Sequence, residues 1–194
     1  MKRIIFATTN SGKMREIREI MKDCGYDICS MKEAGISADI IEDGTTFEEN
    51  ALIKARTIAK LTGEISMADD SGLEIDYLGG APGITSARFL GENTGYDVKN
   101  RYLLQKLEGV SQAERTARFV CAIACVWPGG KSLTKRGTIE GYIGYEERGT
   151  NGFGYDPIFM VPEYGKTTAE LSMEEKNEIS HRARALRAMR KELE

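Results

Sequence analysis

Three short segments, far apart in the chain, contain the residue types that bind and cleave phosphorylated ligands. They are TTNSGK at Thr8–Lys13, ADDSG at Ala68–Gly72 and GFGYDP at Gly152–Pro157. Each combines small residues, which let a ligand approach the backbone, with charged or aromatic side chains. A phosphate-binding turn, a carboxylate pair for a divalent cation and an aromatic platform together predict a site for a nucleoside polyphosphate.

The first segment follows an apolar strand, Ile4–Ala7, and opens a helix. The backbone N–H groups of a helix N-terminus and the point charge of Lys13 suit an anion. Gly12 and Lys13 match the end of the P-loop pattern, but Ala7 and Met14 stand where that pattern needs a glycine and a hydroxyl residue. A Walker-type ATPase or kinase is therefore disfavoured, and an ordinary helix start with a polar cap is the alternative.

The second segment places two carboxylates, Asp69 and Asp70, at the end of an apolar run. Adjacent carboxylates repel each other and strands disfavour Asp, so a cation or a charged network is expected to compensate them. In an extended backbone the two side chains diverge, so only one is expected to face a metal. An Asx-turn that leaves the strand is the alternative. Glu42 lies outside a predicted helix, so the helix dipole does not explain it, and it is the candidate second metal ligand.

The third segment frames Phe153 and Tyr155 with glycines, which suits stacking on a nucleobase. A tight turn whose aromatic rings fill the core is the alternative. Further along, the single histidine of the sequence, His181, adjoins Arg182 and follows Lys176. These cationic groups suit phosphate oxygens or a base carbonyl, whereas a solvated, charged helix face would explain them without a ligand.

Composition limits the function classes. The 194 residues suffice for one large domain or two small lobes, and the 41% hydrophobic and 29% charged residues indicate a globular protein. A net charge of −3 disfavours a nucleic-acid partner. No apolar run is long enough for a membrane helix or a signal peptide, so we expect a cytoplasmic protein with no membrane partner. The four cysteines lack metal or disulfide spacing and are expected to be buried free thiols.

The elements that must position these residues follow from hydrophobic periodicity. Strands are expected over 2–8, 26–30, 65–69, 73–77 and 158–161, with a hairpin of two long strands over 115–126 and 131–145. Helices are expected over 11–23, 46–63 and 94–107, with Val98 on a buried side, and as one helical stripe after 172. The order predicts an α/β protein with a mixed central sheet flanked by helices, an elongated single chain of two lobes around an active-site cleft.

Longer stretches around these segments carry a family resemblance. They are ATTNSGKMREI, EDGTTFEENALIKA, ADDSGLEIDYLGGAPGITSAR, GTNGFGYDPIF and AELSMEEKNEISHRARAL. Over nearly its whole length the chain resembles the non-canonical purine nucleoside triphosphate pyrophosphatases, also called inosine triphosphate pyrophosphatases. The resemblance implies one two-lobed domain over 1–194, often a homodimer. It also implies Mg²⁺-dependent hydrolysis of ITP, dITP and XTP to the monophosphate and pyrophosphate, which keeps these nucleotides out of DNA and RNA.

The same resemblance implies roles for individual residues. Asp70 is expected to act as proton acceptor and to bind Mg²⁺ together with Glu42. The residues expected to bind the substrate are Thr8, Thr9, Asn10, Ser11, Gly12, Lys13, Ser71, Phe153, Gly154, Tyr155, Asp156, Lys176, His181 and Arg182. Residues 8–13 would bind the phosphates, and His181 and Arg182 would lie near the base carbonyl. Rejection of GTP, which shares the 6-oxo group, must then depend on the 2-amino position.

Two other functions remain open from the sequence. A related pyrophosphatase that clears modified pyrimidine or methylated nucleotides is the nearest enzymatic alternative. A nucleotide-sensing module that binds without hydrolysis is the alternative from another class. The sensing module predicts saturable binding without product, and the acidic residues Glu42 and Asp70 argue against it.

Overall fold

A seven-stranded mixed sheet organises the computed structural model, which describes residues 2–193. The strands are β1 (Lys2–Phe6), β2 (Tyr26–Ser30), β3 (Ile65–Ile75), β4 (Thr116–Val126), β5 (Ser132–Ile143), β6 (Phe159–Val161) and β7 (Lys166–Thr167). Their order is β2-β1-β3-β4-β5-β6-β7. β1 pairs in parallel with β2 and β3, whereas β6 pairs antiparallel with β5 and β7. The predicted α/β class with a mixed sheet is confirmed.

The helices complete the fold. The α-helices are α1 (Ser11–Ile20), α2 (Phe47–Thr62), α3 (Tyr96–Lys106), α4 (Met173–Ile179) and α5 (His181–Arg190). Short 3₁₀ helices occur at η1 (Asp76–Leu78), η2 (Gly83–Thr85), η3 (Gln112–Glu114) and η4 (Asp156–Ile158). No helix within 2–193 is both long and apolar enough to cross a membrane.

The described residues cluster into two compact units. Unit 1 comprises 2–71, 121–137 and 181–193, and unit 2 comprises 72–120 and 138–180. Each of the strands β3, β4 and β5 belongs in part to unit 1 and in part to unit 2. The predicted cleft between two lobes stays a prediction.

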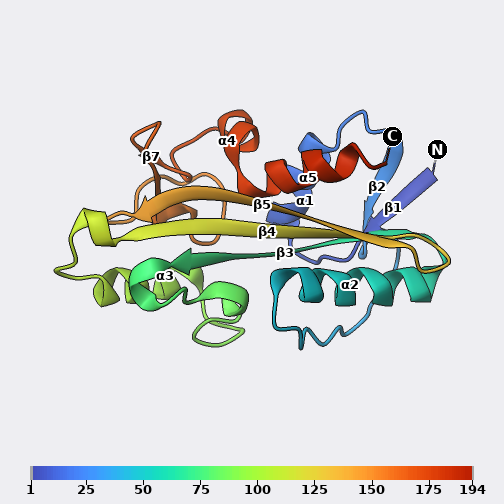
Figure 1. The fold of residues 1–194 in the computed structure, drawn as a ribbon, viewed down its shortest axis with the longest axis horizontal. Helices are drawn as coiled ribbons and strands as arrows, with labels where there is room; N and C mark the ends of the chain where they lie inside the picture. The colour runs from blue at the N-terminus through green and yellow to red at the C-terminus, as the bar shows by residue number, and fades with distance from the viewer. Residues whose placement is uncertain (1, 194) are drawn as a thin grey trace. The chain divides into compact units, whose positions relative to one another are not determined.

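Unit 1 packs helices on both faces of its strands. α1 and α5 lie on one face and contact each other, and α2 lies on the opposite face (Figure 1). The buried apolar side chains on the α1/α5 side are Ile4, Phe6, Met14, Ile17, Met21, Met67, Cys121, Ile123, Cys125, Ala185, Leu186 and Met189. β1 runs parallel to β3 with Phe6 opposite Met67, and the N–H of Ala7 donates to the Met67 carbonyl at 2.8 Å. The turn after β1 therefore begins beside Ala68 and Asp69.

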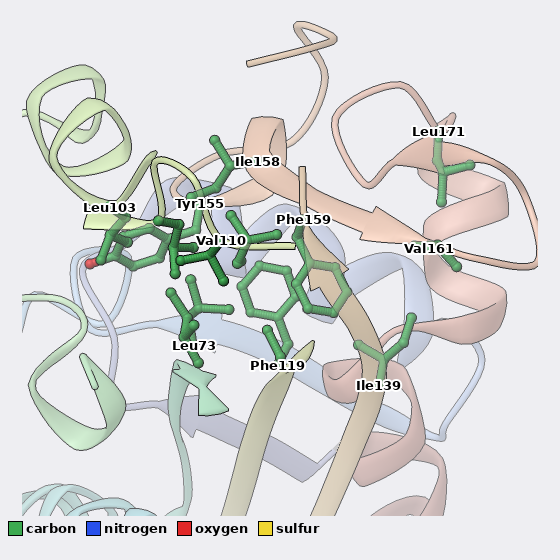
Figure 2. Close-up of a cluster of buried hydrophobic side chains, with 14 residues drawn as sticks. Leu73, Leu103, Val110, Phe119, Ile139, Tyr155, Ile158, Phe159, Val161 and Leu171 are labelled. Carbon is green, nitrogen blue, oxygen red and sulfur yellow. The ribbon is translucent and has the colours of Figure 1, made fainter. Parts of the chain in front are cut away.

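Unit 2 has its own apolar core. Figure 2 shows Phe119 from β4 and Phe159 from β6 meeting at its centre, with ring centroids 4.3 Å apart. Leu103 from α3 and Tyr155 from the GFGYDP segment fill one side of the same cluster. Burial of these large side chains fixes the turn that precedes η4, because Tyr155 cannot leave without opening the core.

The region 65–77 differs from the expectation of two short strands. β3 is one continuous strand that passes through the Asp69–Asp70 pair, so these residues lie inside the strand and not at its end. The Asx-turn alternative is wrong for the same reason. The strand tolerates two acids because each has a cation nearby: Lys13 and Arg182 pair with Asp69, and Lys54 pairs with Asp70. Tyr77 lies beyond the strand in η1 and is 52% exposed.

The helices also differ in two respects from those that hydrophobic periodicity predicts. The C-terminal stripe is two helices, because Ser180 adopts an extended conformation between α4 and α5. Val98 was expected on the buried side of its helix but is 45% exposed. Both capping signals were useful: Ser172 and Glu175 form a full capping box, whereas Thr46 caps α2 while Glu49 accepts from Thr45.

All four thiols are free, as expected, but the expected burial is wrong for Cys24, and we predict that the thiols differ strongly in reactivity. Burial raises the pKa of Cys121 and Cys125 to about 12, whereas Cys24 is partly exposed. The thiolate is the reactive form, so iodoacetamide at about pH 8 should label Cys24 in the native protein and should label Cys121 and Cys125 only after unfolding. Peptide mass spectrometry measures the labelling. Fast modification of native Cys121 would contradict the buried position.

Candidate functional site

The turn between β1 and α1 is a capped helix start. Asn10 accepts the backbone N–H of Lys13 on its side-chain oxygen at 3.0 Å, and Thr8 accepts the N–H of Asn10 on its hydroxyl at 3.2 Å. The predicted polar cap is therefore confirmed. Capping by Asn10 leaves the N–H groups of Ser11 and Gly12 without an acceptor inside the helix, so the turn keeps donors for an anion. Thr9 is exposed beside them.

Asp69 is a fully buried carboxylate surrounded by donors. Its Oδ2 atom lies 3.0 Å from the Lys13 ammonium and 3.2 Å from Nη2 of Arg182. The Ser71 hydroxyl donates to the same oxygen at 3.3 Å and accepts from Arg182 at 3.0 Å. Burial would raise the pKa of Asp69, but the nearby cations outweigh burial and hold this pKa well below its ordinary value. Asp69 is therefore charged in the folded protein.

Arg182 continues this network to α1. Its guanidinium is fully buried, and Nη1 pairs with the buried carboxylate of Glu16 while Nη2 pairs with Asp69. Burial opposes the charge of Arg182, but the two carboxylates raise its pKa above the ordinary value. The sequence analysis missed Glu16. Its signal was an acid on the apolar stripe of α1, next to Ile17, where a charge needs a partner.

Asp70 and Glu42 share a second cation, Lys54 of α2. The ammonium lies 2.9 Å from Glu42 Oε2 and 3.6 Å from Asp70 Oδ1. Burial raises the pKa of Asp70 despite this cation. Burial would lower the pKa of Lys54, but the carboxylates around it raise that pKa instead. Lys54 was missed because it lies within the regular pattern of α2, where a lysine is ordinary.

The two neighbouring aspartates thus have different partners. Asp69 contacts Lys13, Arg182 and Ser71, whereas Asp70 contacts Lys54. This separation is the expected result of side-chain alternation along β3. The charged-network interpretation of the acidic pair is therefore confirmed.

Asp70 and Glu42 are the described side chains best suited to a divalent cation. Asp70 Oδ2 is buried and has no hydrogen-bond partner among residues 2–193, so it keeps a lone pair for a ligand. No group of three or more His, Cys, Asp or Glu side chains in this range is arranged to hold a metal. A cation bound here would complete its shell with water and ligand oxygens, which is how Mg²⁺ usually binds.

Unit 2 has a separate cluster centred on buried Asp156. Its Oδ2 accepts from the Lys176 ammonium at 2.5 Å and from the N–H of Phe153 at 3.0 Å. Its Oδ1 accepts from the Thr168 hydroxyl at 2.8 Å. The Lys176 ammonium also lies 4.9 Å from the centre of the Phe153 ring. This cluster holds the glycine-rich turn, including Gly154, in one conformation.

The aromatic residues of this segment have different environments. Tyr155 is buried, donates its hydroxyl to the Ser86 carbonyl at 2.6 Å and meets Tyr96 edge to face. For Tyr155 the core-filling alternative is correct. Phe153 is only half-buried, and its stacking on a base stays a prediction.

The C-terminal cationic residues are not a solvated helix face. Lys176 is buried in unit 2, and His181 and Arg182 are buried in unit 1. His181 is the first residue of α5, directly after the break at Ser180. That alternative for these residues is therefore wrong, while their contact with a substrate stays a prediction.

Comparison with known proteins identifies the family of this chain. The model of the Ham1 family matches residues 4–192. The chain belongs to the Ham1 family. It is 53% identical to a dITP/XTP pyrophosphatase of Bacillus licheniformis over 189 residues, 97% of this chain and 96% of the relative. It is 50% identical to a dITP/XTP pyrophosphatase of Bacillus subtilis over 194 residues, 100% of this chain and 98% of the relative.

Solved structures agree with this assignment. A Ham1 protein from Coxiella burnetii matches with a TM-score of 0.89 and 43% identity, covering 100% of this chain and 98% of the other. The Staphylococcus aureus Ham1 protein matches with a TM-score of 0.87 and 42% identity, covering 99% and 98%. The family predicted from the sequence motifs is confirmed.

We predict that Gly152 is required by the Asp156 cluster. Its φ is +69°, and an added Cβ would lie 2.1 Å from Asp156 Oδ2 and 3.3 Å from the Lys176 ammonium. Gly165 has a similar φ of +60° but open space around it. We expect Gly165→Ala to cost about 1 kcal/mol of unfolding free energy and Gly152→Ala at least about 3 kcal/mol, since only the latter displaces a buried ion pair. Urea unfolding measures both, and equal losses would contradict the steric argument.

Proposed function

We propose that the protein hydrolyses the non-canonical purine nucleoside triphosphates ITP, dITP and XTP to the monophosphate and pyrophosphate, and so clears them from the nucleotide pool. The proposal rests on the relatives. The chain is identical at about half of all positions to the dITP/XTP pyrophosphatases of Bacillus licheniformis and Bacillus subtilis, over nearly their full length. The chain is therefore a hydrolase that acts on phosphoric anhydride bonds.

The charges of unit 1 support a metal-dependent reaction. The cluster holds four carboxylates, those of Glu16, Glu42, Asp69 and Asp70. Against them stand three cations, Lys13, Lys54 and Arg182. A triphosphate adds several negative charges to a cluster whose described ion pairs set four acids against three cations. An additional cation would offset this charge and favour binding.

Mg²⁺ is the cation we propose, held by Asp70 and Glu42. The unpartnered Oδ2 atom of Asp70 and the raised pKa of this carboxyl group fit a cation ligand, since both mark an incompletely compensated carboxylate. When bound, Mg²⁺ supplies positive charge that offsets the charge developing on the phosphate oxygens.

The chain's own residues have distinct roles in this proposal. Asp70 orients a water molecule and accepts its proton, a role that suits the Oδ2 atom, which has no hydrogen-bond partner among residues 2–193. Lys13 and the N–H groups of Ser11 and Gly12 bind phosphate oxygens and stabilise the leaving pyrophosphate. Neither role requires a covalent intermediate.

Base selection is assigned to donors and a ring. Lys176, which Asp156 holds in place, offers N–H groups to a purine 6-oxo atom, and Phe153 offers a half-buried ring for stacking. The amino group of adenine cannot accept these donors, so ATP would leave an N–H group without an acceptor and bind poorly. The family resemblance also assigns a substrate contact to His181 and Arg182.

A product assay tests this function. Purified protein with Mg²⁺ and ITP should release pyrophosphate and IMP, with GTP and ATP much slower. Release of orthophosphate and IDP would show cleavage of a different bond. Faster turnover of modified pyrimidine triphosphates would assign the protein to the related pyrophosphatases that clear modified nucleotides. Saturable ITP binding without product would indicate a sensing module.

We predict that Asp70→Asn removes turnover and spares binding. The amide keeps the shape of the side chain but cannot accept the proton, so kcat should fall at least about a thousandfold. Calorimetric ITP binding and the thermal unfolding temperature should change little. Asp76→Asn is the matched control. Asp76 directly follows β3, but it pairs with Arg118 at the surface. Near-normal activity of Asp70→Asn would remove Asp70 from the mechanism.

A further inference from the structure

We propose that Asp69 is a positioning residue that anchors Lys13, Arg182 and Ser71 through one oxygen atom and limits how tightly the site holds pyrophosphate. The inference rests on the proposed function, because it assigns Lys13 to the phosphates. It concerns Asp69, because of the two adjacent acids the proposed metal site and proton transfer use only Asp70.

The contacts converge on a single atom. Lys13 at 3.0 Å, Arg182 at 3.2 Å and the Ser71 hydroxyl at 3.3 Å all address Oδ2 of Asp69. Oδ1, also buried, has no hydrogen-bond partner among residues 2–193. These three partners come from α1, α5 and the position of β3 two residues after Asp69. One carboxylate oxygen therefore fixes groups that two helices bring to the strand.

Exposure shows on which side Lys13 is anchored. The Asp69 side chain has no exposed surface and that of Arg182 has 2%, whereas 17% of the Lys13 side chain remains exposed. The Lys13 side chain thus reaches from the surface turn at the start of α1 to a buried acid. A phosphate approaching that turn meets an ammonium group already held from behind, with its remaining N–H groups available.

The charge of Asp69 has a second effect. A carboxylate 3.0 Å from the ammonium cancels part of the attraction between Lys13 and any phosphate in front of it. Positioning raises the rate of the chemical step, and partial cancellation of charge prevents pyrophosphate from remaining bound after cleavage. Both effects disappear together if the carboxylate is replaced by an amide.

Asp69→Asn is the direct test, with Asp76→Asn as the surface control. Loss of the anchor should lower kcat for ITP about 10-fold to 100-fold, because Lys13 and Arg182 are no longer held in one geometry. Removal of one negative charge should at the same time tighten pyrophosphate binding at least about fivefold, measured by calorimetry with Mg²⁺ and as product inhibition. The control should match the wild type in both measurements.

The tighter pyrophosphate binding separates this role from a merely structural one. A variant with a damaged fold would bind pyrophosphate more weakly, so a lower kcat with weaker binding would overturn the proposal. Wild-type values of kcat and affinity would overturn it as well. In a Lys13→Met background the effect of Asp69→Asn on pyrophosphate binding should become smaller, since one of the cations that Asp69 opposes is gone. An unchanged effect there would contradict an action through Lys13.

Asp69→Glu keeps the proposal testable if the asparagine variant does not fold. The charge is retained but the oxygen is displaced by one methylene, so pyrophosphate affinity should stay within about twofold while kcat falls at least about fivefold. Unchanged kcat in that variant would refute the anchoring role. Failure of the proposed function gives a different result: the wild-type protein would neither hydrolyse ITP nor bind pyrophosphate.

Discussion

Compensation of buried charge is the constraint on which unit 1 depends. A guanidinium as buried as that of Arg182 is affordable only between two carboxylates, and Asp69 is stable as an anion only beside Lys13 and Arg182. The network joins α1, β3 and α5, so the apolar packing of these elements and the placement of the charged groups support each other. Any rearrangement of one helix would leave an unpaired charge in the interior.

The geometry of β3 divides the chemistry between two adjacent acids. Because neighbouring side chains of a strand point in opposite directions, Asp69 joins the network of α1 and α5 while Asp70 reaches Lys54 on α2. The parallel pairing of β1 with β3 brings the turn at Thr8–Lys13 to the same place along the strand. Asp69, Asp70 and the turn after β1 thus lie together without a long loop.

Unit 2 applies the same principle to a smaller cluster. Asp156 holds the Lys176 ammonium and the backbone of Phe153, while Tyr155 fills the core beneath the turn. A buried aspartate therefore positions a lysine in each unit, Asp69 with Lys13 and Asp156 with Lys176. Lysine is flexible and its charge is costly to bury alone, so a fixed carboxylate is an effective way to aim it.

The sequence by itself determined the α/β class, the family, the hairpin at Pro128–Gly130 and most helix starts, because hydrophobic periodicity, capping residues and glycine-rich turns are local signals. Only the tertiary structure decided that 65–75 is one strand, that the chain breaks at Ser180 and that Glu16 and Lys54 join the charged clusters. These outcomes depend on partners more than ten positions away, and no local pattern encodes which distant charge will meet Asp69 or Asp70.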